Sequence, residues 1–85
     1  MIYHIFTVYD SKVGAYNRPF FEPSKGSALR SFMDAICDKD SQLSKHSEDY
    51  TLFHIGEYDD QTAVLTSYKT PASLGVASEL KSSSS

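Results

Sequence analysis

Blocks of hydrophobic residues separated by polar and turn-forming stretches divide this chain into predicted strands and one helix. Residues 2–9 are dense in β-branched and aromatic side chains, which is typical of a strand. With a period of two, one face carries Ile2, His4, Phe6 and Val8, and the other carries Tyr3, Ile5, Thr7 and Tyr9. Because both faces are largely apolar, we expect a central or doubly covered strand.

Residues 27–38 show the spacing of an amphipathic helix. Apolar side chains recur at i, i+3, i+4 and i+7, and they are Leu29, Phe32, Met33 and Ile36. This stripe predicts a helix that packs on the sheet, with Ser27 as its N-cap. The preceding residues 11–26 contain two prolines and two glycines, which predicts a long connection without continuous helix or strand ladder.

Two further strands are predicted at residues 50–58 and 62–68. The turn Asp59-Asp60-Gln61 lies between them, so we expect a hairpin. Gly56 inside the first of the two predicts a bulge or a close backbone approach. From Thr70 onward the chain is small and polar, which predicts an irregular C-terminal tail.

The predicted architecture is therefore α+β, in the order β-loop-α-β-β. One helix packs on a small antiparallel or mixed sheet of about three strands. A single domain is expected over residues 1–81, and the serine-rich residues 82–85 are expected to form a disordered tail.

Composition excludes several classes of protein. Hydrophobic residues make up 40% of the 85 residues and charged residues 22%, which is ordinary for a globular protein. The formal charge of −3 excludes a generally basic coat for nucleic acid. Cys37 is the single cysteine, so an internal disulfide framework is excluded and a reducing cytoplasm is expected. The first residues lack the pattern of a secretory or membrane-spanning segment.

The charges are distributed unevenly along the chain. Between residues 11 and 30, four cations stand against one carboxylate, a balance of +3. Between residues 31 and 60, two lysines stand against eight carboxylates, a balance of −6. Any site for a polyanion is therefore predicted in the long connection and at the start of the helix.

The positive section also contains aromatic residues, a combination that suits single-stranded nucleic acid. Cations follow the phosphates, and aromatic rings stack on bases at roughly 1–3 kcal/mol per base. The predicted phosphate contacts are Lys12, Arg18, Lys25 and Arg30. The predicted stacking residues are Tyr16, Phe20 and Tyr9. In the alternative interpretation, Phe20 and Phe21 fold the loop onto the core, and Lys12 and Lys25 are merely solvated.

The predicted strands carry a second aromatic set, formed by Tyr3, Tyr9, Tyr50, Tyr58 and Tyr68. On one side of a sheet these tyrosines would form a platform like those of sheet-based single-strand binders. The alternative is that they are half-buried in the core or form a dimer surface.

No pattern in the chain predicts a metal, a cofactor or catalysis. The candidate ligands His4, His46, His54 and Cys37 lack ligand spacing, although His4 and His54 could be neighbours across two strands. Cys37 follows the core position Ile36, which favours a packing role over a nucleophilic one. The acidic turn at Asp59 and Asp60, with Glu57, is typical of a solvated surface rather than a cation site. Phosphate-binding loops, dinucleotide fingerprints and catalytic triads are not found.

Short runs spread over nearly the whole chain carry a family resemblance. They are Tyr9-Asp10-Ser11-Lys12, Ala15-Tyr16, Pro19-Phe20-Phe21, Lys25-Gly26, Ser44-Lys45-His46, Glu48-Asp49-Tyr50-Thr51-Leu52-Phe53, Ile55-Gly56-Glu57-Tyr58-Asp59-Asp60 and Leu74-Gly75-Val76-Ala77. Together they closely resemble the small nonstructural protein of gokushoviruses, which are single-stranded-DNA phages of the microvirus family. The resemblance implies a viral protein made in the host bacterial cytoplasm and not retained as a main shell component. It also implies DNA binding or a role in single-stranded genome synthesis and packaging, without pointing to particular functional residues.

Two functions remain open at this point. The first is single-stranded DNA binding during phage genome replication or packaging, with a homodimer giving avidity and covering apolar surface. The second is a protein-interaction module that binds the phage replication or capsid proteins, or a host replication factor, without touching nucleic acid.

Overall fold

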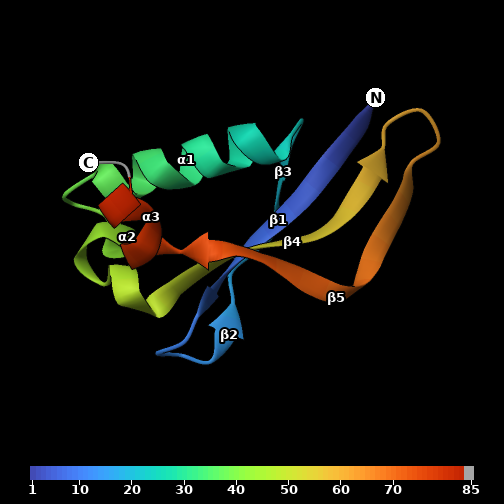
Figure 1. Ribbon diagram of the computed structural model, residues 1–85. Coiled ribbons are helices and arrows are strands. Elements are labelled where there is room, and N and C mark those ends of the chain that lie inside the picture. The colour runs from blue at the N-terminus through green and yellow to red at the C-terminus, as the bar shows by residue number, and fades with distance from the viewer. Residues whose placement is uncertain (84–85) are drawn as a thin grey trace.

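The computed structural model describes residues 1–83 as a curled antiparallel sheet with helices along one side and at one end (Figure 1). The strands are β1 (Ile2–Asp10), β2 (Ala15–Tyr16), β3 (Phe20–Glu22), β4 (Tyr50–Asp59) and β5 (Val64–Val76). The helices are α1 (Lys25–Cys37), α2 (Gln42–Lys45) and α3 (Ala77–Ser83), with a 3₁₀ turn η1 (Ser47–Asp49) before β4.

The sheet is built around β1 and β4. The strand order is β2-β1-β4-β5, and β3 also pairs with β1, every pair being antiparallel. The α+β class, the central first strand and the β4–β5 hairpin are therefore confirmed.

Two predictions about the fold are wrong. The sheet has five strands instead of about three, because β2 and β3 form within the supposed loop at residues 11–26. These strands are only two and three residues long. The prolines in this segment prevent a continuous strand ladder, but they lie outside β2 and β3 and so do not prevent these short strands from pairing. The supposed irregular tail is instead the second half of β5 followed by α3. Of the predicted disordered end at 82–85, Ser82 and Ser83 close α3, and residues 84–85 lie outside the described residues.

Helix α1 is fixed by its N-terminus and by its apolar stripe. It begins two residues before the predicted start, because Ser24 is the N-cap and Ser27 completes a capping box from the N3 position. Ala28, Phe32 and Ile36 are buried against Phe6 and Leu52 of the sheet. Other partly buried side chains complete this core, and they are Phe20, Leu29, Met33, Leu43, Tyr50, Leu74 and Leu80. No helix within residues 1–83 has the length and apolarity needed to cross a membrane.

Gly56 marks the predicted irregularity in β4. The pairing of β1 with β4 shifts by one residue between Ile5↔Gly56 and Phe6↔His54, so Ile55 is a bulge. The pairing with β5 shifts at the same place, between His54↔Ala72 and Gly56↔Ser67. A β-carbon on Gly56 would lie 2.4 Å from the Thr66 carbonyl oxygen. The prediction of a bulge with close backbone approach is therefore confirmed.

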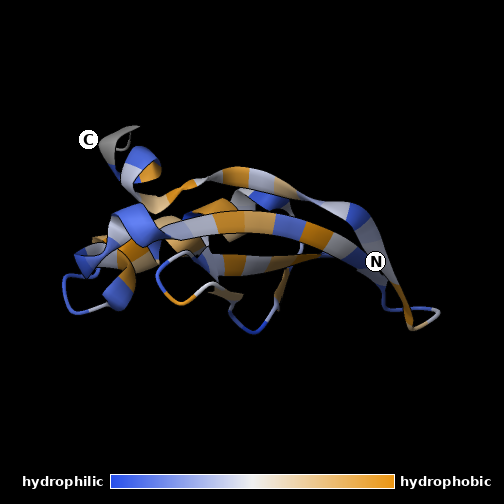
Figure 2. Cartoon of the chain, turned by 90° about the horizontal axis from the view of Figure 1, so that it is seen from below, coloured by the Kyte–Doolittle hydropathy of each residue, from blue (hydrophilic) through white to orange (hydrophobic). Residues whose placement is uncertain are grey.

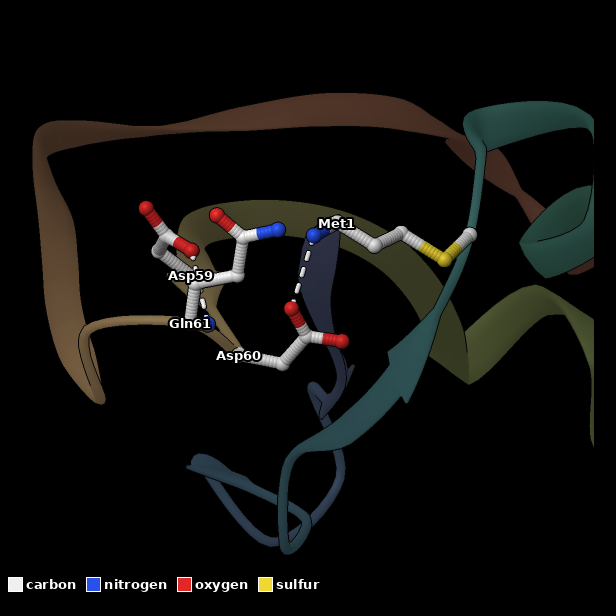
Figure 3. A network of polar contacts seen from close by, with 4 residues as sticks. All are labelled: Met1, Asp59, Asp60 and Gln61. Atoms are coloured by element: carbon white, nitrogen blue, oxygen red, sulfur yellow. Dashed lines mark hydrogen bonds and ion pairs between the residues drawn. The ribbon is translucent and has the colours of Figure 1, made fainter.

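Polar contacts join the start of β1 to the turn between β4 and β5 (Figure 3). The amino group of Met1 donates to Asp60 Oδ1 at 2.7 Å, and the Asp60 amide donates to the Met1 carbonyl at 3.2 Å. Asp59 Oδ1 accepts a hydrogen bond of 2.9 Å from the Gln61 amide. These contacts fix the start of β1 against the tip of the β4–β5 hairpin.

Candidate nucleic-acid interface

One face of the sheet carries the helix α1, and the other face carries aromatic rings. Phe6, Val8 and Leu52 point to α1, so Thr7, Tyr9 and other alternate side chains of β1 point to the opposite side, here called the open face. The bulge at Ile55 reverses the alternation in β4. Phe53 and Tyr58 consequently share the open face although their positions differ by an odd number.

Three rings on the open face contact one another and form what we call the stacking cluster, Tyr9, Tyr16 and Phe53. Tyr9 and Tyr16 face each other across the β1–β2 pair with ring centroids 4.7 Å apart. The Tyr16 ring meets the Phe53 ring edge-on at 5.7 Å. Tyr16 remains 52% exposed, so this ring offers a supported surface for stacking.

A cavity of about 270 Å³ lies beside the Tyr16 ring. Its walls come from Thr7, Tyr16, Asn17, Pro19, Ile55 and Pro71. The connection that forms one wall is anchored on β1, since the Thr7 hydroxyl donates to the Asn17 carbonyl at 2.7 Å and the Asn17 amide donates to the Val8 carbonyl at 2.8 Å. Arg18 is exposed between Asn17 and Pro19, two residues that line this cavity.

Lys12 lies in the tight turn between β1 and β2, near the stacking cluster in sequence but in acidic surroundings. It lines a separate cavity of about 370 Å³ together with Asp10, Glu48, Asp49 and other residues. Asp10 Oδ1 also accepts a hydrogen bond from the Lys12 amide at 3.0 Å. The neighbouring carboxylates offset the Lys12 charge, which weakens its case as a phosphate contact.

Three of the predicted site residues lie on the other side of the sheet. Phe20 is partly buried, and its ring stacks on Phe6 in the core with centroids 5.8 Å apart. Lys25 begins α1, and Arg30 is exposed on the same helix. The structure therefore unites Tyr9 and Tyr16 near Arg18, and it separates these residues from Phe20, Lys25 and Arg30.

The predicted tyrosine platform is divided between the two faces. Tyr3, Tyr9 and Tyr58 are on the open face, while Tyr50 packs against the core and Tyr68 contacts the His54 ring at 4.8 Å. Phe21 also joins the open face, because it pairs with Ile5 and its ring meets Tyr58 edge-on at 5.8 Å. The alternative in which both Phe20 and Phe21 fold onto the core holds for Phe20 only, since Phe21 is 49% exposed.

The side of the sheet that faces α1 holds a polar cluster. His4 Nδ1 and His54 Nε2 are 3.1 Å apart, which confirms that these residues are neighbours across the strands. Burial lowers the pKa of His54, and the nearby His4 and Lys25 lower it further. The Tyr68 hydroxyl donates to Glu57 Oε2 at 2.6 Å, and this bond together with burial raises the pKa of Tyr68 to about 12.

Potential metal ligands come together at a different place. His46, Glu48 and Asp49 have ligand atoms within 4.8 Å of one another around η1, but His46 and Glu48 are exposed. Burial, Asp10 and Asp49 raise the pKa of the neighbouring Tyr50.

Cys37 is exposed at the end of α1, so the predicted packing role for its thiol is wrong. It follows Ile36 in sequence, but the helical turn carries it away from the core.

Sequence reasoning missed Phe53 as a member of the stacking cluster. Its position in a predicted strand with the apolar Leu52 and Ile55 gave no sign of which face it would occupy. The signal that was available is Gly56, since the bulge that it predicts changes which residues share a face.

Comparisons with known proteins identify a family. No curated protein and no solved structure matches this chain. The family model described as Phage ORF5 protein matches residues 3–80, which includes β1 from Tyr3 onward, all of β2 to β5, α1 and the stacking cluster. Since the match covers nearly the whole chain, this phage protein belongs to the Phage ORF5 protein family.

Proposed function

We propose that this protein binds single-stranded DNA through the open face of its sheet, during viral genome replication or packaging in the host bacterial cytoplasm. The observation that carries the proposal is the half-exposed Tyr16 ring, backed by Tyr9 and Phe53 and bordered by a cavity. A base stacked on Tyr16 would rest on a supported ring, at roughly 1–3 kcal/mol. The motif resemblance leads us to place the phage among the gokushoviruses. The proposal includes no catalytic step, cofactor or metal.

Arg18 is the proposed phosphate contact. It follows Asn17, whose amide and carbonyl are both held by β1, so its backbone has a fixed place beside the stacking cluster. A guanidinium contacts phosphate through several donors, which suits a site with little positive charge overall. Because the chain carries a net charge of −3, binding would depend on this local arrangement, and with few phosphates neutralised it would weaken only modestly with salt.

The test is fluorescence anisotropy of a labelled oligothymidylate, with single-stranded and duplex forms compared over a salt series. Tyr16→Ala should weaken single-strand binding by about 5- to 150-fold, the equivalent of 1–3 kcal/mol. Arg18→Glu should weaken binding and reduce the salt slope. The matched control is Arg30→Glu, which makes the same charge change on α1 and should have a much smaller effect. Undetectable binding at low salt for both forms of DNA would refute the proposal.

A second candidate function is a protein-interaction module for the phage replication or assembly machinery. It is favoured by the acidic cavity at the η1 end, where Asp10, Glu48 and Asp49 surround Lys12. In this case Arg18→Glu would leave phage propagation intact, and charge reversal at Glu48 and Asp49 would impair it. A pull-down from infected cells would then recover a phage or host protein that stays bound after nuclease treatment.

A further inference from the structure

Exposed hydrophobic side chains gather at the end of the sheet that lies away from α2 and α3. Tyr3, Tyr58 and Leu65 stand side by side in register on β1, β4 and β5, and Phe21 of β3 contacts Tyr58. These four residues, here called the end patch, line a cavity of about 330 Å³. Figure 2 shows hydrophobic segments along these strands and next to the tip of the β4–β5 hairpin.

The end patch continues toward the middle of the open face. A second cavity of about 240 Å³ shares Phe21 and Leu65 with the first and adds Pro19 and Ile55. By strand alternation Met1 shares the face of Tyr3 and is 56% exposed, whereas the exposed Ile2 and Val64 point to the α1 side of the sheet. Among residues 1–83, most of the large hydrophobic side chains that remain exposed are therefore at this end.

The exposed area is of the size that a small homodimer needs. Phe21 is 49% and Leu65 63% exposed, so on a scale of about 150–250 Å² for a whole large side chain each leaves on the order of 100 Å² open. With Tyr3, Tyr58, the exposed Met1 and the exposed Pro19, one copy offers on the order of 500 Å². Two copies would bury on the order of 1,000 Å², which is close to the minimum for a biological interface and below the usual range of about 1,200–2,000 Å².

The charge around the end patch favours a second copy of the chain over a charged partner. In a two-fold contact every residue meets the same kind of surface, so like charges within the patch would repel. None of the four residues is charged, although the chain has a net charge of −3. Asp60, at the tip of the hairpin beside the patch, forms an ion pair of 2.7 Å with the Met1 amino group. This ion pair reduces the negative charge that two facing copies would bring together at the edge of the contact.

We propose that the end patch is the contact surface of a homodimer, in which two copies pack their end patches together about a two-fold axis. The contact would add apolar burial to a core that has only eight buried hydrophobic residues among residues 1–83. The stacking cluster lies six residues further along β1, about 20 Å away, so it stays open in this dimer. Two such clusters on one assembly would bind a single DNA strand with avidity.

The test is the mass of the protein in solution, by sedimentation equilibrium over a wide concentration range. The wild-type chain should approach twice its 9.5 kDa mass, and Leu65→Glu should be shifted toward the monomer. Placing a glutamate at the centre of a symmetric contact should raise the dissociation constant by about thirtyfold or more. The matched control is Val13→Glu, which charges a 74% exposed apolar side chain in the β1–β2 turn and should leave the dimer intact.

Phe21→Ser serves as a second variant, and circular dichroism verifies that each variant is folded. A wild-type chain that remains monomeric at the highest concentration would overturn the proposal, as would a dimer that Leu65→Glu and Phe21→Ser both leave unchanged. The assignment does not rest on DNA binding. A dimer that is disrupted by Leu65→Glu but binds no oligothymidylate would support this interface and refute the proposed function.

Discussion

Replacing Gly56 with alanine tests the close packing that gives the open face its shape. The added β-carbon would lie 2.4 Å from the Thr66 carbonyl oxygen and 3.2 Å from the Ser67 Cα. Both neighbours are backbone atoms of the paired strand β5, so no flexible side chain can move aside. Either β5 shifts by a large fraction of an ångström or the bulge at Ile55 rearranges.

The expected cost follows from this geometry. Overpacking a tight site typically costs about 1–3 kcal/mol, and a clash with paired backbone belongs at the upper end, about 3 kcal/mol. At about 0.05–0.15 kcal/mol per residue, a chain of this size has a free energy of unfolding of about 4–13 kcal/mol. Gly56→Ala would therefore remove a large part of the stability and lower the melting temperature by about 12–24 °C.

The assay is urea unfolding followed by circular dichroism, together with a thermal melt. Gly26→Ala is the matched control, because a β-carbon there would meet only Ser24 Oγ at 3.7 Å. This control lies in the first turn of α1, so alanine should leave stability unchanged or raise it by up to about 1 kcal/mol. If the two variants unfolded within about 0.5 kcal/mol of each other, a margin typical of neutral surface changes, the account of Gly56 would be refuted.

Three further predictions concern the helix cap and the polar cluster beside α1. Ser24→Ala removes the capping box and should cost about 0.5–2 kcal/mol of unfolding free energy in urea; an unchanged midpoint would exclude the cap. Tyr68→Phe should abolish the last step of the absorbance titration at alkaline pH, since the bond to Glu57 raises the pKa of Tyr68 to about 12; a step that persists near pH 12 would contradict the assignment. The pKa of His54 lies below its ordinary value of 6.5 in the folded chain, so the unfolded chain binds more protons. The contribution of neutral His54 to the free energy of unfolding should be fully present above pH 6.5 and should be lost as the pH falls below that value. His54→Asn, which leaves His4 in place, should make the free energy of unfolding less dependent on pH in this range.

The repeating hydrophobic patterns made the main elements predictable from sequence. The apolar run in residues 2–9 and the stripe from Leu29 to Ile36 correspond to β1 and α1. Helix α1 buries one face, whereas β1 is buried on both faces at its centre, over residues 5–8. The acidic turn Asp59-Asp60-Gln61 correctly predicted where the hairpin turns between β4 and β5. Local patterns were sufficient here because the apolar run of β1 and the apolar stripe of α1 mark the residues that each element buries.

The missed elements depend on partners that are distant in sequence. β2 and β3 are too short to show a period, and they exist because β1 offers them an edge. The small, polar residues of the second half of β5 extend a strand only by pairing with β4. The same limit applies to the site. The pairing of Tyr9 with Tyr16 comes from the β1–β2 turn, whereas the loss of Lys25 and Arg30 from that site reflects the position of α1 across the sheet.

The most direct test of the proposed function is amide chemical-shift mapping of the ¹⁵N-labelled protein during titration with oligothymidylate. The account predicts shifts centred on Tyr9, Tyr16 and Phe53, which extend to Arg18 and leave the exposed side of α1 around Arg30 unchanged. Shifts centred on α1 with Tyr16 unaffected, or no shifts at saturating oligonucleotide, would contradict it.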